Sequence, residues 1–399
     1  MHESKTDAVD DGQALTHVPL LVIGAGPYGL ATAACAKNAG IEQFVVGKPM
    51  AFWRENMPAG MFLRSGPDWH LDSAGVNTFM AYLDERGIDP SEVEPIPVWL
   101  FLDYVDWFEE RADIDVVPDL VRDLSRSNRH FEATLESGRR VGADAVVAAP
   151  GISHFTVIPE WVEQNLSPER WTHTCHLVRF DQLRGKRAMI VGGRQSAFEW
   201  AALLADGDAE EIHVVYRHDT PDFTASDWHF VDPLMDLTAT VPGWFRRLPA
   251  EERETVIKRF WAEGRLRLEP WLTPRLDKPS VHRWPHASVA ACKEVPGGGI
   301  EVELSDGTHL EVDHVVLATG YKPDMREVPY LAGVVDDMDL VDGFPVLDEH
   351  FQSSVPGLFV TGFPATRDFG PFFGFVRGCP VAAELTTAGL EEALGRAPS

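Results

Sequence analysis

Two short apolar runs divide the chain, and each is followed by glycines and then by a helical pattern of small residues. The first run covers residues 20–23 and leads into Gly24-Ala25-Gly26-Pro27-Tyr28-Gly29. Four apolar residues are too few for a buried helix and are typical of a strand inside a parallel sheet. The following segment, 30–39, has a helical composition and stops at Gly40. The pattern therefore predicts a strand, a glycine turn and a helix.

This turn has the spacing G-x-G-x-x-G, which suits the pyrophosphate of a dinucleotide. In the motif Gly24 permits the tight turn, Gly26 lets the backbone approach the pyrophosphate, and Gly29 lets helix and strand pack closely. The N-terminus of the helix adds unpaired N–H groups and a positive dipole end. The cofactor-binding candidates of this turn are Gly24, Gly26, Pro27, Tyr28 and Gly29.

The segment after the second expected strand departs from this motif. That strand, residues 43–46, should end in Asp or Glu to hold a ribose hydroxyl, but Gly47 and Lys48 follow it. The ribose contact must therefore differ or be absent, and Lys48 stays a cofactor-binding candidate. The stretch 52–65 is rich in aromatic residues and Met. It could wrap a flat apolar ring through Trp53 and Met61, or it could be an ordinary hydrophobic loop.

An internal repeat connects two distant parts of the chain. Residues 131–151 and 300–320 align without a gap, and Asp144 matches Asp313. Each copy alternates polar and apolar residues around a Ser-Gly or Asp-Gly turn and leads into a buried strand, which predicts a β-hairpin. Two such copies imply two dinucleotide-binding units of related construction.

The second apolar run, 188–191, leads into a damaged glycine turn and a helix over 198–205. Arg194 takes the place of the middle glycine, where it could block a pyrophosphate or swing round and neutralise it; we favour the second. The next strand, 213–216, ends in Arg217, which suits the 2′-phosphate of NADPH better than an acid would, although it could also be a solvated charge. The cofactor-binding candidates of this unit are Gly192, Gly193, Arg194, Gln195, Ser196 and Arg217.

Composition narrows the class of protein. The chain has 399 residues and a net charge of −27, which disfavours binding to nucleic acid or to anionic membranes. Residues 1–16 carry no secretion signal and no run of about 18 apolar residues occurs, so we expect a flexible tail and a cytoplasmic protein. None of the four cysteines forms a C-x-x-C pair, which argues for a reducing compartment and against a dithiol reductase. The 15 histidines are scattered, and we expect no metal site.

The predicted fold is α/β, with two Rossmann-like domains, the second inserted into the first, and β-hairpin connections. The first dinucleotide-binding domain takes residues 17–169 and 296–395, and the second, the nicotinamide-nucleotide domain, takes residues 170–295. Residues 221–285 hold five tryptophans and read as a helical insertion, either a substrate-facing lid or an ordinary aromatic core.

The two glycine turns, the sequence Ala318-Thr319-Gly320-Tyr321 and the segment 356–359 together resemble two-dinucleotide-binding-domain flavoproteins. Within that group, the stretch 52–65 and the segment 97–104 resemble the flavin-containing monooxygenases and the N-hydroxylating flavoprotein monooxygenases. The resemblance covers about residues 20–395. It implies FAD at the first turn, NADPH at the second, and a flavin C4a-hydroperoxide as the oxidant.

The resemblance implies an NADPH-driven monooxygenase that uses molecular oxygen on a small-molecule substrate, with amine N-hydroxylation favoured. Two alternatives stay open: an FAD-dependent NAD(P)H oxidoreductase that inserts no oxygen, and a flavin-binding redox sensor with a decayed nicotinamide site. The oligomeric state also stays open. We expect a helix from Pro371 to about Leu394, with its N-terminus aimed at the flavin. The catalytic candidates are Arg64 and Asp368, and the further cofactor-binding candidates are Thr319, Gly320, Gly362, Phe369 and Gly370.

Overall fold

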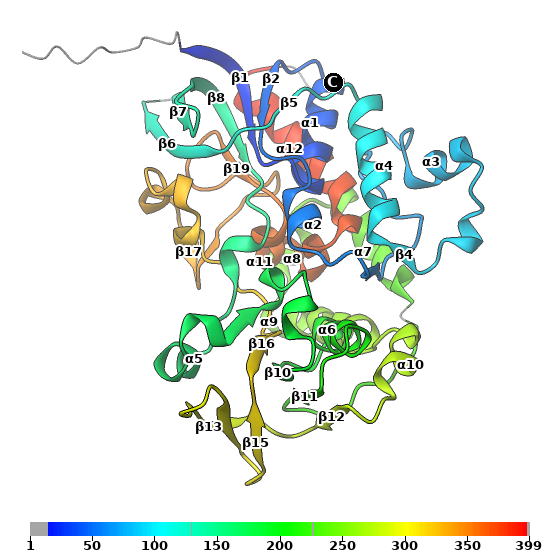
Figure 1. Cartoon of the computed structure of the whole chain (residues 1–399). Coiled ribbons are helices and arrows are strands. Elements are labelled where there is room, and N and C mark those ends of the chain that lie inside the picture. The colour runs from blue at the N-terminus through cyan, green and yellow to red at the C-terminus, as the bar shows by residue number, and fades with distance from the viewer. Residues whose placement is uncertain (1–14, 129, 226, 397–399) are drawn as a thin grey trace, which may run out of the picture.

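The structure is a computed structural model that describes residues 15–396 except 129 and 226. The tail expected over residues 1–16 lies outside the described residues apart from its last two. Two sheets form two domains, which lie one above the other in Figure 1; the second sheet is parallel, and the first is parallel except for the antiparallel pairs β6–β7 and β7–β8. The chain starts in the upper domain, crosses to the lower one and returns through β19 (Leu358–Val360), so the second domain is inserted into the first. The predicted fold class is therefore confirmed.

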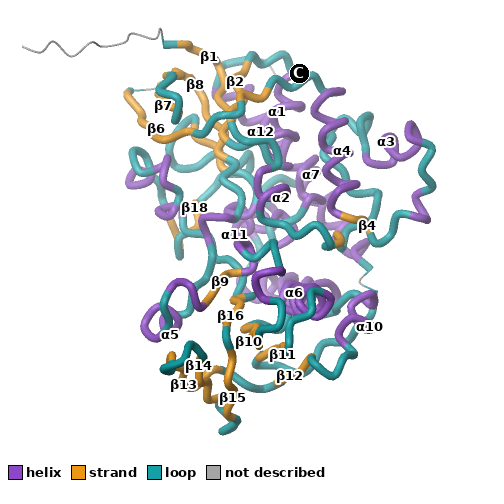
Figure 2. The backbone as a smooth tube through the Cα atoms, in the orientation of Figure 1, coloured by secondary structure: helices purple, strands orange, loops and turns teal. Residues whose placement is uncertain are grey.

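The first sheet has the strand order β5-β2-β1-β8-β7-β6, with β19 beside β8. The apolar run 20–23 is the C-terminal half of β1 and is buried, because strands flank it on both sides and helices cover the sheet. Helices α1 (Pro27–Asn38), α7 (Asp232–Thr240) and α12 (Cys379–Ala393) lie together on one side of it (Figure 2). The remaining strands are β1 (Thr16–Ile23), β2 (Gln43–Val46), β5 (Val116–Val117), β6 (Val121–Ser127), β7 (His130–Leu135) and β8 (Arg140–Ala148).

The second sheet has the strand order β12-β11-β10-β16-β9, and α6 (Gln195–Asp206) packs against it. A three-stranded antiparallel sheet, β13-β14-β15, adjoins it. These strands are β9 (Trp171–His173), β10 (Arg187–Val191), β11 (Glu211–Val215), β12 (Val281–Trp284), β13 (Val289–Glu294), β14 (Ile300–Leu304), β15 (His309–Val312) and β16 (His314–Leu317).

This pairing corrects the predicted domain boundary after residue 295. Strand β16 pairs in parallel with β10, so residues 296–317 belong to the second domain. The second hairpin copy thus serves the second sheet, as the first copy serves the first sheet through β8 and β1.

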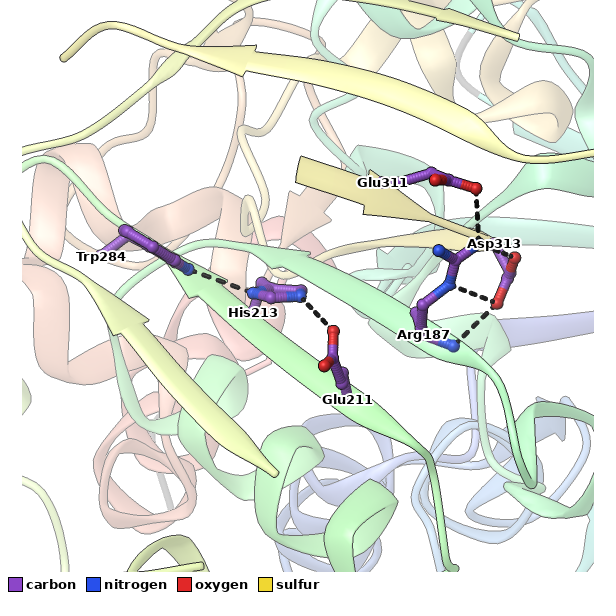
Figure 3. A network of polar contacts seen from close by, with 6 residues as sticks. All are labelled: Arg187, Glu211, His213, Trp284, Glu311 and Asp313. Carbon is purple, nitrogen blue, oxygen red and sulfur yellow. Dashed lines mark hydrogen bonds and ion pairs between the residues drawn. The ribbon is translucent and has the colours of Figure 1, made fainter. Parts of the chain in front are cut away.

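The repeated aspartates have the same structural role in both domains. Asp313 accepts hydrogen bonds from the Arg187 guanidinium, at 2.9 Å to Nη2, and so ties the hairpin to β10 (Figure 3). That arginine lowers the pKa of Asp313. Asp144 is bonded at 2.9 Å by His17 of β1 and at 2.8 Å by His130 of β7. Of the described residues, these three are the group with metal-ligand spacing, and their bonding ties neighbouring strands together.

A second group of polar contacts links neighbouring strands of the second sheet. Trp284 of β12 donates a hydrogen bond to Nδ1 of His213 at 3.3 Å, and Glu211 lies 3.3 Å from the other ring nitrogen (Figure 3). His213 is buried, and burial is the main cause of its lowered pKa.

The predicted insertion is helical and covers the first domain. Besides α7 it contains α8 (Trp244–Arg247), α9 (Ala250–Arg259), a π-helical turn (Phe260–Arg265) and α10 (Thr273–Leu276), and it ends in β12 of the second sheet. Trp228 packs against Trp69 and Phe375, with ring centroids 5.9 and 5.4 Å away. Both suggested roles for the insertion are therefore compatible with its position, since it has an aromatic core and contacts the first domain.

The remaining elements frame the upper domain. The apolar spacing predicts helices over 76–87 and 98–112, and the structure contains α3 (Phe79–Arg86) and α4 (Val98–Arg111) there. Thr78 caps α3 by accepting a hydrogen bond from the Ala81 N–H at 3.1 Å, and Gly87 ends it. The others are α2 (Ala51–Glu55), β3 (Phe62–Leu63), β4 (Ile96–Pro97), β17 (Leu340–Val341), β18 (Phe344–Pro345) and α11 (Thr366–Phe369). Helix α5 (Glu160–Asn165) instead packs against β13 in the lower domain.

The expected helix from Pro371 is wrong at its start. Residues Pro371–Gly374 form a separate 3₁₀ turn, and α12 begins only at Cys379, which is followed by a proline suited to a first helical turn. The long helix therefore does not begin at the position from which its dipole was expected to act on the flavin. Across the described part of the chain, no helix has the length and apolar character needed to cross a membrane.

Candidate active site

A cavity of about 1840 Å³ is lined by residues of both domains and by both glycine turns. Pockets for one small ligand measure roughly 300–1,000 Å³, so this volume suits more than one ligand. Eighteen of the predicted site residues lie on its wall: Gly24, Gly26, Pro27, Tyr28, Gly29, Lys48, Trp53, Met61, Arg64, Gly192, Gly193, Arg194, Gln195, Ser196, Arg217, Thr319, Gly320 and Gly362.

The first glycine turn has the geometry of a pyrophosphate cradle. A Cβ atom on Gly29 would lie 1.8 Å from the carbonyl oxygen of Gly24, and one on Gly24 would lie 2.3 Å from that of Ala149. A Cβ on Gly26 would meet nothing within 4 Å, so this residue faces open space at the start of α1. Two glycines are therefore fixed by packing, and the third leaves room for a ligand. These residues fit the pyrophosphate of FAD.

Gly47 explains why the second strand lacks its acid. A Cβ at this position would lie 2.7 Å from the backbone nitrogen of Ala25, so the end of β2 runs directly against the first glycine turn. Lys48, the next residue, is exposed on the cavity wall. The side chain that approaches the expected ribose position is therefore a cation.

The aromatic side of the first domain closes around Tyr28. Its hydroxyl donates a hydrogen bond to the carbonyl oxygen of Phe375 at 2.7 Å, and Gly362 lies against its ring. Trp53 and Met61 line the same cavity and are half-buried. Thr319 donates to the carbonyl oxygen of Val157 at 2.5 Å, where the chain passes between the domains.

The second glycine turn repeats the packing of the first. A Cβ on Gly192 would lie 2.4 Å from the carbonyl oxygen of Ala318, which is the residue that matches Ala149 in the repeat. The guanidinium carbon of Arg194 lies 3.5 Å from the ring centroid of Trp261, so this side chain contacts the insertion. Burial, and then the charge of Arg217, lower the pKa of Arg194. The glycine turn and Arg217 thus remain on the wall of the cavity, where they fit NADPH.

Arg64 joins the aromatic stretch of the first domain to the insertion. Its Nε lies 2.9 Å from Oε1 of Glu269, and its Nη2 donates to the carbonyl oxygens of Gly264 and Arg267 at 2.9 and 2.7 Å. Burial is the main cause that lowers its pKa. These bonds fix the guanidinium in place, so Arg64 positions the loop and the insertion on the cavity wall.

Asp368, Phe369 and Gly370 do not line the cavity, and the structure gives the side chains of Asp368 and Phe369 other contacts than the expected ones to the flavin. Asp368 is buried, accepts a hydrogen bond from the Leu347 N–H at 2.9 Å and pairs with Arg367 at 2.7 Å. Phe369 stacks on Phe351 with ring centroids 3.6 Å apart. A carboxylate and an aromatic ring near a motif read as site residues in sequence, but here they hold the C-terminal segment in the core.

Replacing Asp368 with asparagine is expected to lower the free energy of unfolding by about 1–3 kcal/mol, because the buried charge-assisted pair with Arg367 is lost. The FAD content per folded protein should stay unchanged, because Asp368 does not line the cavity. Thermal unfolding and the flavin absorbance of the purified protein measure the two effects. A folded D368N protein that loses FAD would return Asp368 to the cofactor site.

Four further residues at or beside the cavity were not predicted from the sequence: Glu199, Glu269, Trp261 and Arg265. Glu199 is buried at the cavity wall, and one of its oxygens accepts a hydrogen bond from Gln195 at 2.8 Å. Burial is the main cause that raises its pKa to about 7. Only its position on the helix after the second glycine turn could have pointed to Glu199. The other three residues lie in the insertion, and their contact partners are far away in the sequence.

The raised pKa of Glu199 makes stability depend on pH. The folded state holds this proton more tightly than the unfolded state, whose carboxyl has the ordinary pKa of 4.5, so stability falls as pH rises from about 4.5 through about 7. Replacing Glu199 with glutamine removes the penalty. We expect E199Q apoprotein to be about 1–3 kcal/mol more stable than the parent at pH 8 and nearly equal to it at pH 4.5. Thermal unfolding at both pH values measures this, and an equal shift at both would contradict it.

The four cysteines are free, and they lie in different elements of the structure. Cys175 lies on the cavity wall, where burial raises the pKa of its thiol. A buried thiol of raised pKa is a poor nucleophile, and it has no second thiol with which to form a redox pair. The site is therefore not that of a dithiol reductase.

Comparisons with known proteins bear on these features. A family model described as pyridine nucleotide-disulphide oxidoreductase matches residues 21–236. The FAD-dependent urate hydroxylase of Xanthomonas campestris is 25% identical over 328 residues, which cover 73% of this chain and 66% of that protein, just under two thirds of its length. A probable indole-3-pyruvate monooxygenase of Arabidopsis thaliana is 25% identical over 340 residues, which cover 76% of this chain and 75% of that protein.

Solved structures with the same fold include two N-hydroxylating enzymes. The ornithine N-hydroxylase of Kutzneria sp. 744 superposes with a TM-score of 0.76 at 17% identity, covering 94% of this chain and 99% of that one. The reduced ornithine hydroxylase of Pseudomonas aeruginosa gives a TM-score of 0.77 at 16% identity, covering 95% and 100%. The resemblance read from the sequence is therefore confirmed. With more than half of its residues matched by the family model, this chain belongs to the pyridine nucleotide-disulphide oxidoreductase family and has the fold of the two ornithine hydroxylases.

Proposed function

We propose that the protein is an FAD-dependent, NADPH-driven monooxygenase that transfers one oxygen atom of O₂ to a small organic substrate. The balanced reaction consumes substrate, O₂, NADPH and a proton, and yields oxygenated substrate, water and NADP⁺. When bound, FAD supplies the hydride acceptor and the oxygen chemistry, which no protein side chain can supply.

The observation that carries this proposal is the continuous cavity shared by the two glycine turns. A cradle that fits FAD and a turn that fits NADPH open into the same space, so their reactive ends can meet. The four free cysteines leave no dithiol to accept electrons instead. Electrons delivered to this cavity must therefore pass to a ligand, and oxygen is the acceptor used by the relatives named as monooxygenases and hydroxylases.

The chain's own residues would bind and orient the two cofactors and would keep water out of the cavity. Gly26 and the start of α1 hold the FAD pyrophosphate, and Arg217 holds the 2′-phosphate of NADPH. The aromatic side chains of the cavity wall, such as Trp53 and Phe375, keep water from the reacting ends of the ligands.

Amine N-hydroxylation is the favoured chemistry. It is supported by the fold shared with two ornithine hydroxylases and with a cadaverine monooxygenase from Erwinia amylovora. We also propose a cytoplasmic location, because free cysteines suit a reducing compartment.

The test is anaerobic mixing of the FAD-loaded protein with NADPH, and separately with NADH, while the flavin absorbance is followed. We expect rapid bleaching by NADPH and slower bleaching by NADH. Air is then admitted with candidate amines, and oxygenated product is measured by mass spectrometry with ¹⁸O₂. Bleaching with no labelled product from any substrate would indicate a reductase. A flavin that neither nucleotide bleaches would indicate a sensor with a decayed nicotinamide site.

A further inference from the structure

Four arginines follow one another along the cavity wall, from the end of β11 to the aromatic stretch of the first domain. We call Arg217, Arg194, Arg265 and Arg64 the arginine row; all four line the cavity. The electrostatic repulsion between individual arginines shows which of them are neighbours. The charge of Arg217 lowers the pKa of Arg194, and Arg265, whose pKa burial lowers to about 10, also feels Arg194 and Arg64.

The middle of the row rests on aromatic rings. The guanidinium carbons of Arg194 and Arg265 lie 3.5 and 4.8 Å from the ring centroid of Trp261, and Arg265 also lies 5.4 Å from that of Phe375. Rings stabilise a cation through their faces but accept none of its strong hydrogen bonds. Arg194 is exposed, so water can accept from its N–H groups, whereas Arg265 is half-buried between Trp261 and Phe375, and its N–H groups are directed along the cavity wall.

The protein supplies a carboxylate at only one end of the row. Arg64 pairs with Glu269. For Arg194 and Arg265, the part of the chain that the structure describes provides no carboxylate within ion-pair distance and no hydrogen-bond acceptor. This is notable in a chain with 62 acidic residues and 35 basic ones. Placing like charges together in a partly buried site is unfavourable unless an anion binds there.

Arg217, at one end of the row, and Arg265, in its middle, lie beside different ligand sites. Arg217 ends the strand after the second glycine turn, which is the position of the NADPH 2′-phosphate. Arg265 packs on Phe375, whose carbonyl oxygen accepts the hydrogen bond from Tyr28 of the first glycine turn. Arg265 therefore lies on the FAD side of the cavity, where the substrate must approach.

We propose that Arg265 and Arg194, above Trp261, bind a carboxylate of the substrate, so that this enzyme acts on an anionic or zwitterionic compound. This inference rests on the proposed function. An amino acid or an aromatic acid meets the guanidinium pair with its carboxylate and leaves its other end to the oxygenation site. A simple diamine, which carries two positive charges, is repelled by the same pair.

The experiment measures binding to the FAD-loaded full chain with three probes of similar size: phenylacetate, phenylacetamide and phenethylamine. Isothermal titration calorimetry is used, with and without saturating NADP⁺. We expect phenylacetate to bind about 10- to 100-fold more tightly than phenylacetamide, and phenethylamine to bind most weakly, since a charge-assisted pair is gained only by the acid.

The variants are Arg265→Met and Arg194→Met, which keep an apolar chain on Trp261. Each substitution should weaken the binding of phenylacetate by about tenfold or more and leave the binding of phenylacetamide unchanged. Arg259→Gln is the matched control, because Arg259 is in the same insertion, pairs with Glu263 at 2.8 Å and does not line the cavity. FAD content and thermal unfolding verify that each variant is folded.

Two results would overturn the inference. Equal binding of phenylacetate and phenylacetamide to the parent would remove the carboxylate site. If R265M weakened the binding of NADP⁺ and left the binding of phenylacetate unaffected, the two arginines Arg194 and Arg265 would be assigned to a phosphate of the nucleotide. Neither result depends on turnover, so a failure of the proposed function, seen as absent flavin reduction or absent oxygenated product, is recognised separately.

Discussion

Replacing Gly26 with alanine is expected to abolish FAD retention while leaving the apoprotein folded. A Cβ at this position meets no protein atom within 4 Å, and its backbone angles, φ −86° and ψ −176°, are ones that alanine adopts freely. The added methyl instead occupies the space through which the pyrophosphate approaches the start of α1. Two hydrogen bonds to a charged group, at about 1.5–3 kcal/mol each, depend on that approach. We therefore expect the dissociation constant of FAD to rise at least about 100-fold.

The measurements are flavin content after purification, calorimetric titration of apoprotein with FAD, and thermal unfolding of the apoprotein. Gly299→Ala is the matched control, because it adds the same methyl in the β13–β14 turn, where the nearest atom is the flexible carboxylate of Glu311 at 3.3 Å. Gly29→Ala gives the opposite contrast, since its Cβ would collide with the Gly24 carbonyl oxygen and disturb the apoprotein itself. A G26A protein that keeps FAD at the parent affinity would show that the pyrophosphate lies elsewhere.

The glycine turns could be predicted from sequence because their geometry dictates residue identity locally. A Cβ on Gly24 or on Gly192 would collide with a carbonyl oxygen, of Ala149 and of Ala318 respectively, so no other residue fits there. The same contact in both domains is the structural counterpart of the internal repeat. The hairpins could also be predicted, because alternating polar and apolar residues around a glycine turn are a local feature of the sequence.

The domain boundary could not be predicted because the repeat looks alike in both copies. Alternation and an Asp-Gly turn specify a hairpin that leads into a buried strand, but they do not specify which sheet that strand joins. The pairing of β16 with β10 depends on contacts between residues more than a hundred positions apart, such as that of Arg187 with Asp313.

The candidate site was incomplete for a related reason. Trp261, Arg265 and Glu269 come from the helical insertion; the first two reach the cavity wall, and Glu269 contacts Arg64, only after the insertion folds onto the first domain. Its mixture of arginine and tryptophan was visible in the sequence, but its partners were not. Asp368 failed in the opposite direction, because burial and a backbone partner, neither visible in sequence, place it in the core.

Replacing Arg217 with glutamine is expected to remove the preference for NADPH over NADH. Arg217 is exposed on the cavity wall at the end of β11, where the second Rossmann unit meets the adenosine ribose. A guanidinium holds a 2′-phosphate by a charge-assisted fork worth about 1.5–3 kcal/mol, and NADH has no group for it to hold. The NADPH concentration that gives half-maximal flavin reduction should therefore rise about 10- to 100-fold, while that for NADH changes little.

Stopped-flow reduction of the bound flavin with each nucleotide measures the two constants. Arg184→Gln is the control, since Arg184 is an exposed arginine of the same domain that does not line the cavity and the charge change is identical. The parent's preference should also shrink with added salt, because the contact is exposed, and the preference of R217Q should not. Equal loss for NADPH and NADH in R217Q would mean that Arg217 acts on a part shared by both nucleotides. In that case Arg194, its neighbour in the arginine row, becomes the residue to test for the 2′-phosphate, and Arg265 alone would be left for the carboxylate of the substrate.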